Sequence, residues 1–311
     1  MKMTNKAGCV LGIDAGGTFL KASLVRADRS FVSESVIRMR AYSEGSVSEI
    51  RDAFRSLCTA AAAQAAEAGE DIKGIGICVP GPFDYQAGTS LMKHKYRAVY
   101  GISMRPWFRE ILGGIPLCFL HDSHAFLLGA LWQEKETFLR AAGVTIGTGL
   151  GFASWKNGSL LKNDAGGPGI SIFSRPYRQG ISEDYVSRRA VIRNFYEYGG
   201  QDSRIDAAEI ADLALQGNAA AVKAFQQLGA DLARIVHDIL VENRFEALFL
   251  GGAISKSYSL FQKNLCEYLH DVPSLKRIAP AYDIDTAPIL GAVRAVCAVE
   301  QETSQVSGLF T

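Results

Sequence analysis

Short apolar runs separated by glycine-containing or polar turns fill the first part of the chain. The runs Gly8–Ile13, Phe19–Val25 and Phe31–Met39 each have the length and apolar character of a strand. The turns that join them are short, which favours an antiparallel meander. Two later runs, Lys73–Val79 and Ile115–Leu120, predict two further strands.

Two segments of this first part have helical spacing instead. Ser46 and Glu49 form a capping box, and apolar residues then recur every three or four positions along a helix that we expect to end at Gly69. Ser123 can cap a second helix that extends to about Glu134. Strands and helices alternating in this way predict an α/β unit.

The pattern repeats in outline in the second half. Strands are expected at Ala142–Ile146 and Phe152–Trp155, with an Asn157-Gly158 hairpin turn and a return strand at Ser159–Leu161. Residues 163–180 are rich in Gly, Pro and polar side chains and predict an irregular loop. The remaining segments predict helices at 182–198, 206–216 and 219–243, a strand at 247–250, and helices from Ser257 and from Pro288 to about Glu300.

Each half contains a strand, a glycine turn and two more strands. That repetition indicates a duplicated α/β fold with two domains around a central cleft. We expect the smaller N-terminal domain to comprise residues 1–120 and 288–311, and the larger C-terminal domain to comprise residues 121–287.

The composition is that of a globular protein. The 311 residues are 48% hydrophobic and 21% charged, with a formal net charge of +1. This balance gives no basic footprint for nucleic acid. No apolar run is long enough to span a bilayer and no signal peptide is evident, so we expect a cytoplasmic protein without a membrane partner. The six cysteines are dispersed without a CxxC pair, which predicts buried, reduced thiols and no structural zinc.

Two glycine turns are the first candidates for chemistry. Asp14-Ala-Gly-Gly-Thr18, the first glycine turn, can bring backbone N–H groups and a threonine hydroxyl to a phosphate, while Asp14 can hold a hydrated Mg²⁺. Gly147-Thr-Gly-Leu-Gly151, the second glycine turn, is of the same kind. An ordinary hairpin turn explains either one alone, but two such turns in corresponding places suggest a clamp on the phosphates of one nucleotide. Neither matches a Walker P-loop or a dinucleotide fingerprint.

Two further segments follow apolar strands. His121-Asp122 lies where a strand ends and a helix begins, so Asp122 can accept a proton from a substrate hydroxyl; helix capping is the alternative interpretation. Gly251-Gly252 follows the strand at 247–250 and leaves room for a flat ring such as adenine, although an ordinary βα turn would have the same pattern.

Taken in order, these segments resemble the ROK family of sugar kinases, which belongs to the actin-like (ribonuclease H-like) ATPase superfamily. The segments that carry the resemblance over nearly the whole chain are Asp14–Thr18, Gly76–Pro82, His121-Asp122, Thr145–Gly151, Gly180–Ser187 and Leu250–Gly252.

The resemblance implies an ATP- and Mg²⁺-dependent phosphotransferase that acts on a hydroxyl of a hexose or hexose derivative, with Asp122 as catalytic base and Asp14 holding Mg²⁺ through water. It also implies a homodimer. The implied nucleotide- and phosphate-binding residues are Asp14, Gly16, Gly17, Thr18, Lys21, Gly147, Thr148, Gly149, Gly251 and Gly252. The implied sugar-binding residues are Pro80, Gly81, His121, Asp122, Ile170, Phe173 and Glu183.

The chain departs from the family pattern on the sugar side. His121 stands where the family usually has Asn, and Ile170 and Phe173 stand where a Glu and a His hold sugar hydroxyls. Ile181 stands where the last of the family's zinc cysteines would be. Because a site that hydrogen-bonds hydroxyls discriminates strongly, these changes predict an altered sugar preference or a decayed activity.

Three functions therefore compete. A glucokinase-like sugar kinase is favoured because Asp14, Asp122 and both glycine turns are present. The alternative is a catalytically weak sensor of sugar or nucleotide, which the altered sugar side would explain. A DNA-binding repressor is not expected, because only about seven residues precede the first predicted strand.

Overall fold

The structure is a computed structural model that describes residues 8–93, 95–201 and 204–307. It divides into two compact units. Within the described residues, the first unit comprises the chain up to Trp132, the short segment Lys162–Gly167 and the chain from Thr286 onward. The second unit comprises Gln133–Leu161 and Pro168–Asp285. The expected boundaries at residues 120/121 and 287/288 differ from this division, which groups the helix after His121 with the first unit.

The first unit contains a five-stranded sheet in the order β3-β2-β1-β4-β7. The strands β1, β2 and β3 form the expected antiparallel meander, and β4 and β7 are parallel to β1. The sheet strands are β1 Gly8–Ala15, β2 Phe19–Arg26, β3 Ile37–Arg40, β4 Asp71–Val79 and β7 Leu117–His121. The other elements are α1 Val47–Glu67, α2 Arg105–Leu112, α3 Asp122–Gln133, α9 Ala287–Ser307, η1 Arg97–Val99 and the small hairpin β5 Phe83–Asp84 with β6 Thr89–Ser90.

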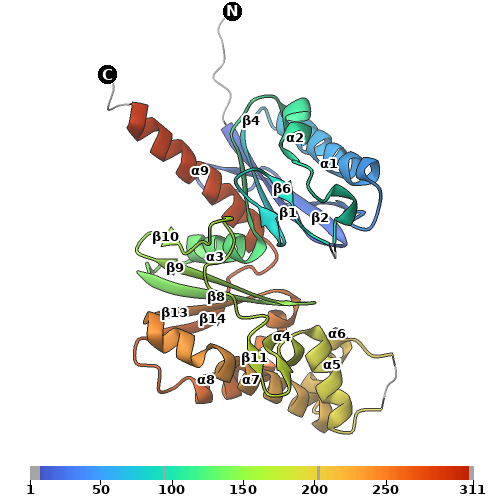
Figure 1. The fold of residues 1–311 in the computed structure, drawn as a ribbon, viewed down its shortest axis with the longest axis vertical. Coiled ribbons are helices and arrows are strands. Elements are labelled where there is room, and N and C mark those ends of the chain that lie inside the picture. Colours follow the sequence, from blue (N-terminus) through green and yellow to red (C-terminus); the bar gives the residue numbers. More distant parts are fainter. Residues whose placement is uncertain (1–7, 94, 202–203, 308–311) are drawn as a thin grey trace, which may run out of the picture. The chain divides into compact units, whose positions relative to one another are not determined.

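Alternating side chains of this sheet pack on two sets of helices. On β1, Leu11 and Ile13 join the apolar core that includes α1, whereas Val10 packs with Val293 of α9. Figure 1 shows α1 and α2 on one side of the strands and α9 on the other. The close approach of α9 depends on Gly12 and on other small residues, because a Cβ on Gly12 would lie 2.6 Å from a backbone oxygen of α9.

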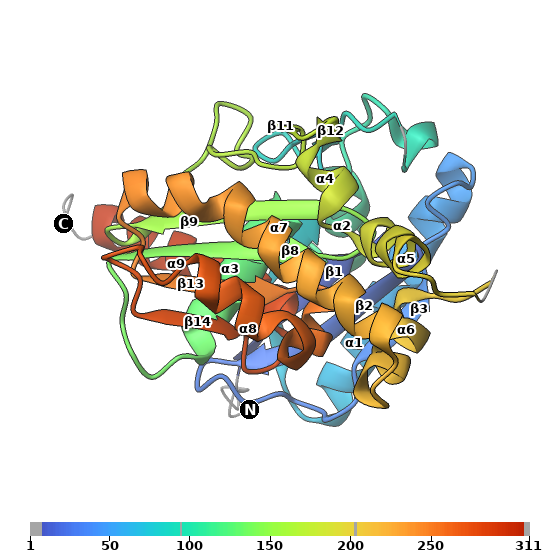
Figure 2. The ribbon, with the colours of Figure 1, turned by 90° about the horizontal axis from the view of Figure 1, so that it is seen from below.

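The second unit repeats the strand topology in the order β10-β9-β8-β13-β14, with the same mixture of antiparallel and parallel pairs. The expected duplication is thus confirmed. Its strands are β8 Arg140–Ile146, β9 Leu150–Lys156, β10 Ser159–Leu160, β13 Ala247–Gly251, β14 Arg277–Pro280 and the separate pair β11 Pro176–Tyr177 and β12 Gly180–Ile181. Its helices are α4 Ser182–Tyr185, α5 Arg188–Glu197, α6 Ala207–Leu215, α7 Ala219–Asn243, η2 Ala253–Ser257 and α8 Tyr258–Tyr268. The long helices α7 and α8 pack side by side (Figure 2).

Several expected elements differ in detail. The single helix expected at 182–198 is two helices, because Val186 leaves helical geometry and Ser187 caps α5 by accepting a hydrogen bond from the Ala190 amide. The strand expected at Phe31–Met39 begins only at Ile37. Helix α2 and strand β14 were not expected, because they have only eight and four residues and such short segments carry a weak pattern.

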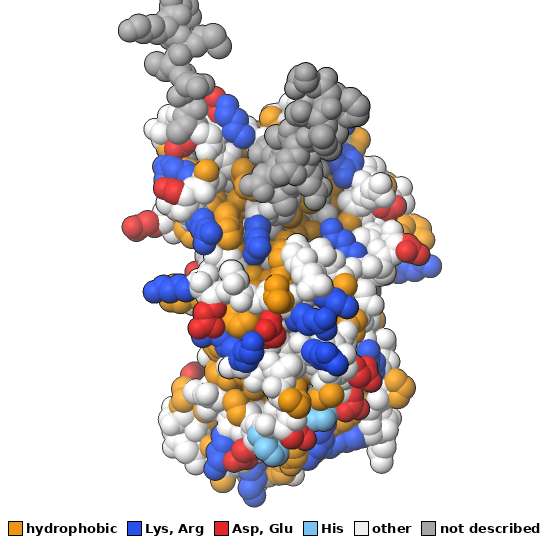
Figure 3. All heavy atoms as spheres, turned by 90° about the vertical axis from the view of Figure 1, so that its left-hand side faces the viewer, with side chains coloured by type: hydrophobic (Ala, Val, Ile, Leu, Met, Phe, Trp, Pro, Cys, Tyr) orange, Lys and Arg blue, Asp and Glu red, His pale blue; other side chains and the backbone are white. Residues whose placement is uncertain are grey.

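The surface agrees with the near-zero net charge. Figure 3 shows Lys and Arg side chains interspersed with Asp and Glu side chains over the described part of one face, without a large area of one sign. No described helix has the length and apolar character needed to span a membrane.

Candidate active site

The carboxyl ends of three parallel strands bring the candidate catalytic residues of the first unit to one edge of its sheet. In the register, Asp14 of β1 pairs with Cys78 of β4, and Val79 of β4 pairs with His121 of β7. Asp122 follows directly as the first residue of α3. Ligand sites in α/β folds form at such edges, so the structure places these predicted residues where chemistry is expected.

The first glycine turn joins β1 to β2, and its carbonyl groups point into the protein. The Gly16 oxygen accepts a hydrogen bond from Tyr96 Oη at 2.7 Å, and the Gly17 oxygen accepts one from Ser43 Oγ at 2.5 Å. The amides of Gly17 and Thr18 donate to no described residue. An anion site requires backbone amides that are available as donors and carbonyl groups that are turned away and hydrogen-bonded elsewhere, and the turn has this arrangement.

Asp14 lies half-buried at the start of this turn. Desolvation raises its pKa to about 6, with a further increase from the charge of Asp122 and an opposing effect from Lys21. Lys21 stands opposite Asp14 across the β1–β2 pair. Among the described residues, the Asp14 side chain accepts a hydrogen bond only from the weak Cys78 thiol donor, at 3.6 Å. A carboxylate with so much unused acceptor capacity fits the water shell of a Mg²⁺ ion, whose remaining ligands would be phosphate oxygens.

Asp122 is held by its two neighbours in the sequence. Its Oδ1 atom lies 2.8 Å from His121 Nδ1 and accepts a hydrogen bond from the Ser123 amide at 2.7 Å. Burial by itself raises the pKa of Asp122, but His121, the Ser123 amide and the charge of Lys95 outweigh burial and hold the pKa below its usual value. The side chain is 45% exposed, so it remains accessible to a substrate.

Lys95 is a residue that the sequence analysis missed. Its side chain covers Gly17, since a Cβ built on Gly17 would lie 3.3 Å from Lys95 Cδ and Cε. The next residue, Tyr96, is 2% exposed and hydrogen-bonds to both Gly16 and Ser43, which fixes the loop. Nothing in the local sequence pairs this loop with the turn at residues 14–18, so only the folded chain reveals the contact.

The second glycine turn joins β8 to β9 in the second unit. The Gly147 amide donates to the Gly149 oxygen, and the Gly147 oxygen accepts from the Arg188 amide. Glu183 lies against this turn, accepting a hydrogen bond from the Leu150 amide at 3.0 Å. The Glu183 carboxylate packs directly on Gly149, since a Cβ built there would lie 2.6 Å from Glu183 Oε2. The structure thus brings Glu183 to the predicted phosphate turn, and Thr148 stays exposed.

Gly251 and Gly252 lie at the end of β13 in the same unit. Gly252 has a φ of +82°, and a Cβ there would lie 2.4 Å from the Ile146 oxygen. The Gly251 oxygen accepts a hydrogen bond from Ser255 Oγ at 2.7 Å. The backbone after β13 therefore packs against the end of β8, which leads into the second glycine turn.

The predicted sugar-binding residues fall in different places. Gly81 packs beside the His121 ring, and the Tyr85 ring lies 5.9 Å from that ring. The segment 162–167 belongs to the same unit, since the Tyr85 amide donates to the Ala165 oxygen. By contrast, Ile170 packs against the core of the second unit, and Phe173 is 48% exposed there. Pro80 lies in the first unit, directly before Gly81.

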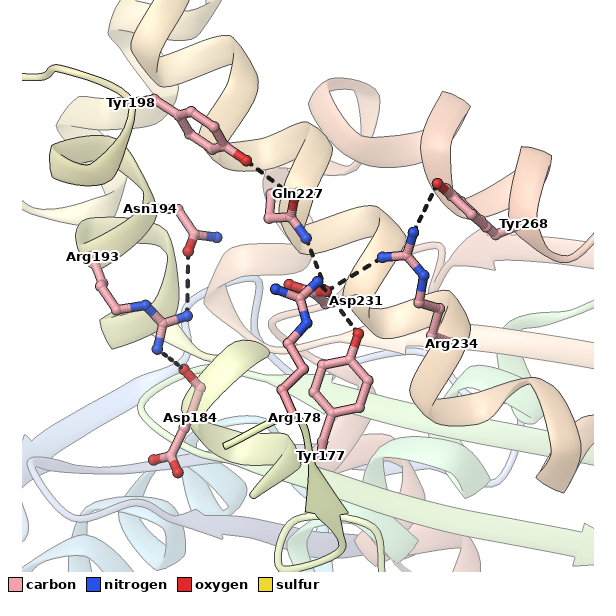
Figure 4. A network of polar contacts seen from close by, with 10 residues as sticks. All are labelled: Tyr177, Arg178, Asp184, Arg193, Asn194, Tyr198, Gln227, Asp231, Arg234 and Tyr268. Carbon is pink, nitrogen blue, oxygen red and sulfur yellow. Dashed lines mark hydrogen bonds and ion pairs between the residues drawn. The ribbon is translucent and has the colours of Figure 1, made fainter. Parts of the chain in front are cut away.

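A polar network fixes the hairpin that precedes Glu183. Figure 4 shows Tyr177 and Arg178 pointing to Asp231, a fully buried residue of α7. Asp231 Oδ1 accepts hydrogen bonds from Tyr177 Oη at 2.8 Å, Arg178 Nη2 at 2.5 Å and Gln227 Nε2 at 2.9 Å. The hairpin then continues directly into α4, so this network also restrains Glu183 at the second glycine turn.

The described residues contain no group of three or more His, Cys, Asp or Glu side chains that could hold a metal ion. None of the cysteines in the described residues forms a disulfide, and Cys9, Cys58 and Cys78 are buried as expected, whereas Cys118, Cys266 and Cys297 are only partly buried.

Comparison with known proteins assigns the chain to a family. Residues 10–298 match the ROK family, so the chain belongs to that family. The glucokinase of Thermotoga maritima is 23% identical over 92% of this chain and 96% of its own length. The β-glucoside kinase of Listeria innocua is 29% identical over 34% of this chain and 37% of its own length.

Solved structures agree on the fold. The ROK family glucokinase of Streptomyces griseus, in complex with glucose and AMPPNP, has a TM-score of 0.76 at 21% identity and covers 94% of this chain and 100% of its own. A ROK family transcriptional regulator, a homologue of the E. coli MLC protein, has a TM-score of 0.79 at 16% identity over 93% of this chain and 78% of its own. The fold is therefore the duplicated, actin-like α/β fold of this family.

Proposed function

We propose that the protein is an ATP-dependent sugar kinase that transfers the γ-phosphoryl group of ATP to a hydroxyl of a hexose or hexose derivative. The observation that carries this proposal is the edge of the first sheet, where Asp122 and the first glycine turn come together in one unit. The full-length match to the ROK family and the kinases among the relatives support it.

Each of these residues has a separate role in the proposed reaction. Asp122 accepts the proton of the attacking hydroxyl through the oxygen that His121 and Ser123 do not occupy. The Gly17 and Thr18 amides bind phosphate oxygens and stabilise charge in the transition state. A Mg²⁺ ion held by Asp14 through water would neutralise phosphate charge. The family resemblance adds Lys21, Gly147, Thr148, Gly149, Gly251 and Gly252 as nucleotide-binding residues.

A sugar-dependent release of ADP tests this function. We expect release with at least one member of a panel of hexoses, N-acylated hexoses and deoxyhexoses. Asp122→Asn should lower turnover by ~10²–10⁴-fold and leave ADP affinity nearly unchanged, because the amide cannot accept the proton. A variant that keeps more than half of the wild-type turnover would show that Asp122 is not the base.

We further propose that glucose is a poor substrate and that a substituted hexose is preferred. Ile170 and Phe173 cannot hydrogen-bond through their side chains, so a sugar hydroxyl buried against them would lose roughly 1–3 kcal/mol. In kcat/KM this corresponds to roughly 5–150-fold between glucose and the preferred sugar. Glucose turned over as efficiently as every substituted hexose in the panel would contradict the altered sugar side while leaving the kinase intact.

A second candidate function is a catalytically weak sensor of the same fold. The apolar side chains at Ile170 and Phe173 favour it, as does the regulator among the structural neighbours. Binding of sugar and ATP without ADP release from any member of the panel would support the sensor. A homodimer, implied by the family resemblance, is part of the proposal for either function.

A further inference from the structure

The loop between β6 and η1 brings one lysine to the first glycine turn. The Tyr96 amide donates to the Ser43 oxygen at 2.8 Å, and Tyr96 Oη donates to the Gly16 oxygen at 2.7 Å. Because Ser43 Oγ in turn donates to the Gly17 oxygen, the loop and the turn are connected twice. Lys95, which directly precedes Tyr96, is therefore held in place by contacts that involve the turn itself.

The Lys95 side chain extends along Gly17. A Cβ on Gly17 would lie 3.3 Å from Lys95 Cδ and Cε and 3.6 Å from Nζ. The side chain is half-buried, and its ammonium forms no ion pair with a described carboxylate. A positive charge beside the unused amides of the first glycine turn adds to the attraction of that turn for an anion, so the lysine and the turn together favour an anion at this place.

The position of this charge also relates it to the candidate base. Lys95 is one of the groups that hold the pKa of Asp122 down, together with His121 and the Ser123 amide. It thus lies close enough to Asp122 for a Coulomb interaction and, at the same time, against the turn with the unused Gly17 and Thr18 amides. An anion bound at those amides would lie within reach of both.

We infer that Lys95 binds the phosphoryl group that is transferred, as a further catalytic residue of the proposed kinase. This inference rests on the proposed function. In the step, a bond forms between the acceptor oxygen and the γ-phosphorus, and the bond from phosphorus to the β–γ bridging oxygen breaks. ADP leaves with that electron pair, and the hydroxyl proton passes to Asp122. The Lys95 ammonium stabilises the charge on the equatorial oxygens of the γ-phosphoryl group.

The chain offers a matched control two residues away. Lys93 lies in the same loop but is exposed, with its ammonium 5.6 Å from the centre of the Tyr100 ring. Lys93→Met and Lys95→Met therefore remove the same charge from the same loop, but only the second removes it from the glycine turn. Lys95→Arg keeps the charge with a different geometry and serves as the conservative variant.

Steady-state kinetics on the best sugar provide the first test. We expect Lys95→Met to lower kcat by about 10²-fold or more, Lys95→Arg to restore at least part of that loss, and Lys93→Met to stay within about twofold of wild type. The acid limb of kcat/KM should also move to higher pH in Lys95→Met, because a nearby positive charge favours the ionised form of Asp122. The titratable groups that interact with Asp122, namely His121, Asp14, Cys78 and Tyr85, and the Ser123 amide are unchanged in these variants.

Nucleotide binding by calorimetry provides a test that does not require turnover. Lys95→Met should weaken AMPPNP binding about tenfold and change ADP binding less than about twofold, since only AMPPNP carries a γ-phosphoryl group. Equal losses for both nucleotides, or kcat for Lys95→Met within threefold of that for Lys93→Met, would overturn the inference. A wild-type protein inactive on every sugar would instead contradict the proposed function, and the comparison of AMPPNP with ADP would still decide whether Lys95 contacts the γ-phosphoryl group.

Discussion

The half-buried Asp14 carboxylate lowers the free energy of unfolding by an amount that depends on pH. Its folded pKa of about 6 lies above the usual aspartate pKa of 3.8, so folding favours the protonated form. The cost is fully present above pH 6 and is relieved as the pH falls from 6 to about 4. A shift of this size corresponds to at most ~3 kcal/mol, and partial exposure of the side chain reduces that to roughly 1–2 kcal/mol.

Asp14→Asn should therefore raise the melting temperature of the nucleotide-free protein at pH 8 by a few degrees, and by less at pH 5. It should also abolish ADP release, because an amide is a poor ligand for hydrated Mg²⁺. Asp28→Asn is the contrasting control: Asp28 accepts hydrogen bonds from Ser30 that lower its pKa, so its replacement should not stabilise the protein. An equal change of melting temperature for Asp14→Asn at both pH values would contradict the argument.

At the scale of residues, sequence reasoning located the groups that lie in short contiguous motifs. Asp14 and His121 lie at the ends of strands and Asp122 follows one directly, and such strand ends can be recognised from the apolar run before them. Lys95 could not be found in this way, because its place depends on a loop that reaches the turn at residues 14–18 through Tyr96 and Ser43. Contacts of that kind are set by tertiary packing and leave no local pattern.

At the scale of elements, α3 and α9 cross so closely that their backbones are in contact. A Cβ on Gly291 of α9 would lie 1.7 Å from the Ala125 oxygen, and a Cβ on Gly129 of α3 would lie 1.8 Å from the Ala287 oxygen. Since α3 begins at Asp122, this crossing helps to fix the candidate base.

Gly291→Ala should therefore lower the free energy of unfolding by roughly 2–4 kcal/mol, because one of the two helices must move away. Displacement of α3 should also lower turnover. Gly114→Ala is the matched control, since a Cβ there meets nothing within 4 Å and the backbone needs no left-handed geometry. Denaturant unfolding of both variants decides the matter, and equal stabilities would show that the helices separate without cost.

The elements that sequence reasoning predicted best have strong local signals. The capping box at Ser46 marks the start of α1, as expected, and α6 begins directly after Asp206, which forms a second capping box. The break between α4 and α5 was missed, because residues 182–198 have a continuous helical pattern while the chain must turn there to place Glu183 against Leu150. The hairpin at 176–181 was assigned to an irregular loop, since its order depends on the distant Asp231.

At the scale of the whole molecule, the duplicated sheet topology was predictable because both halves repeat a strand, a glycine turn and two strands. The division into units was less predictable from the sequence. Helix α3 and the segment 162–167 group with the first unit through packing that involves α9 and Tyr85, respectively. Sequence order alone favours a boundary at the end of a strand, whereas contacts across the chain determine the actual division.

Each unit has an extensive apolar core of its own, which should suffice for stability without a structural metal. Zinc requires deprotonated thiolates, yet burial raises the pKa of Cys9 to about 11 and that of Cys58 to about 12. Dialysis against EDTA should therefore leave the melting temperature of the nucleotide-free protein within about 1 °C of its starting value. The same treatment should abolish sugar-dependent ADP release until Mg²⁺ is restored, because the proposed reaction needs that ion on the phosphates.

Elemental analysis of protein purified without a metal-binding tag completes the test. Near-stoichiometric zinc, or a melting temperature that falls by more than about 5 °C on chelation, would show that a metal stabilises the fold.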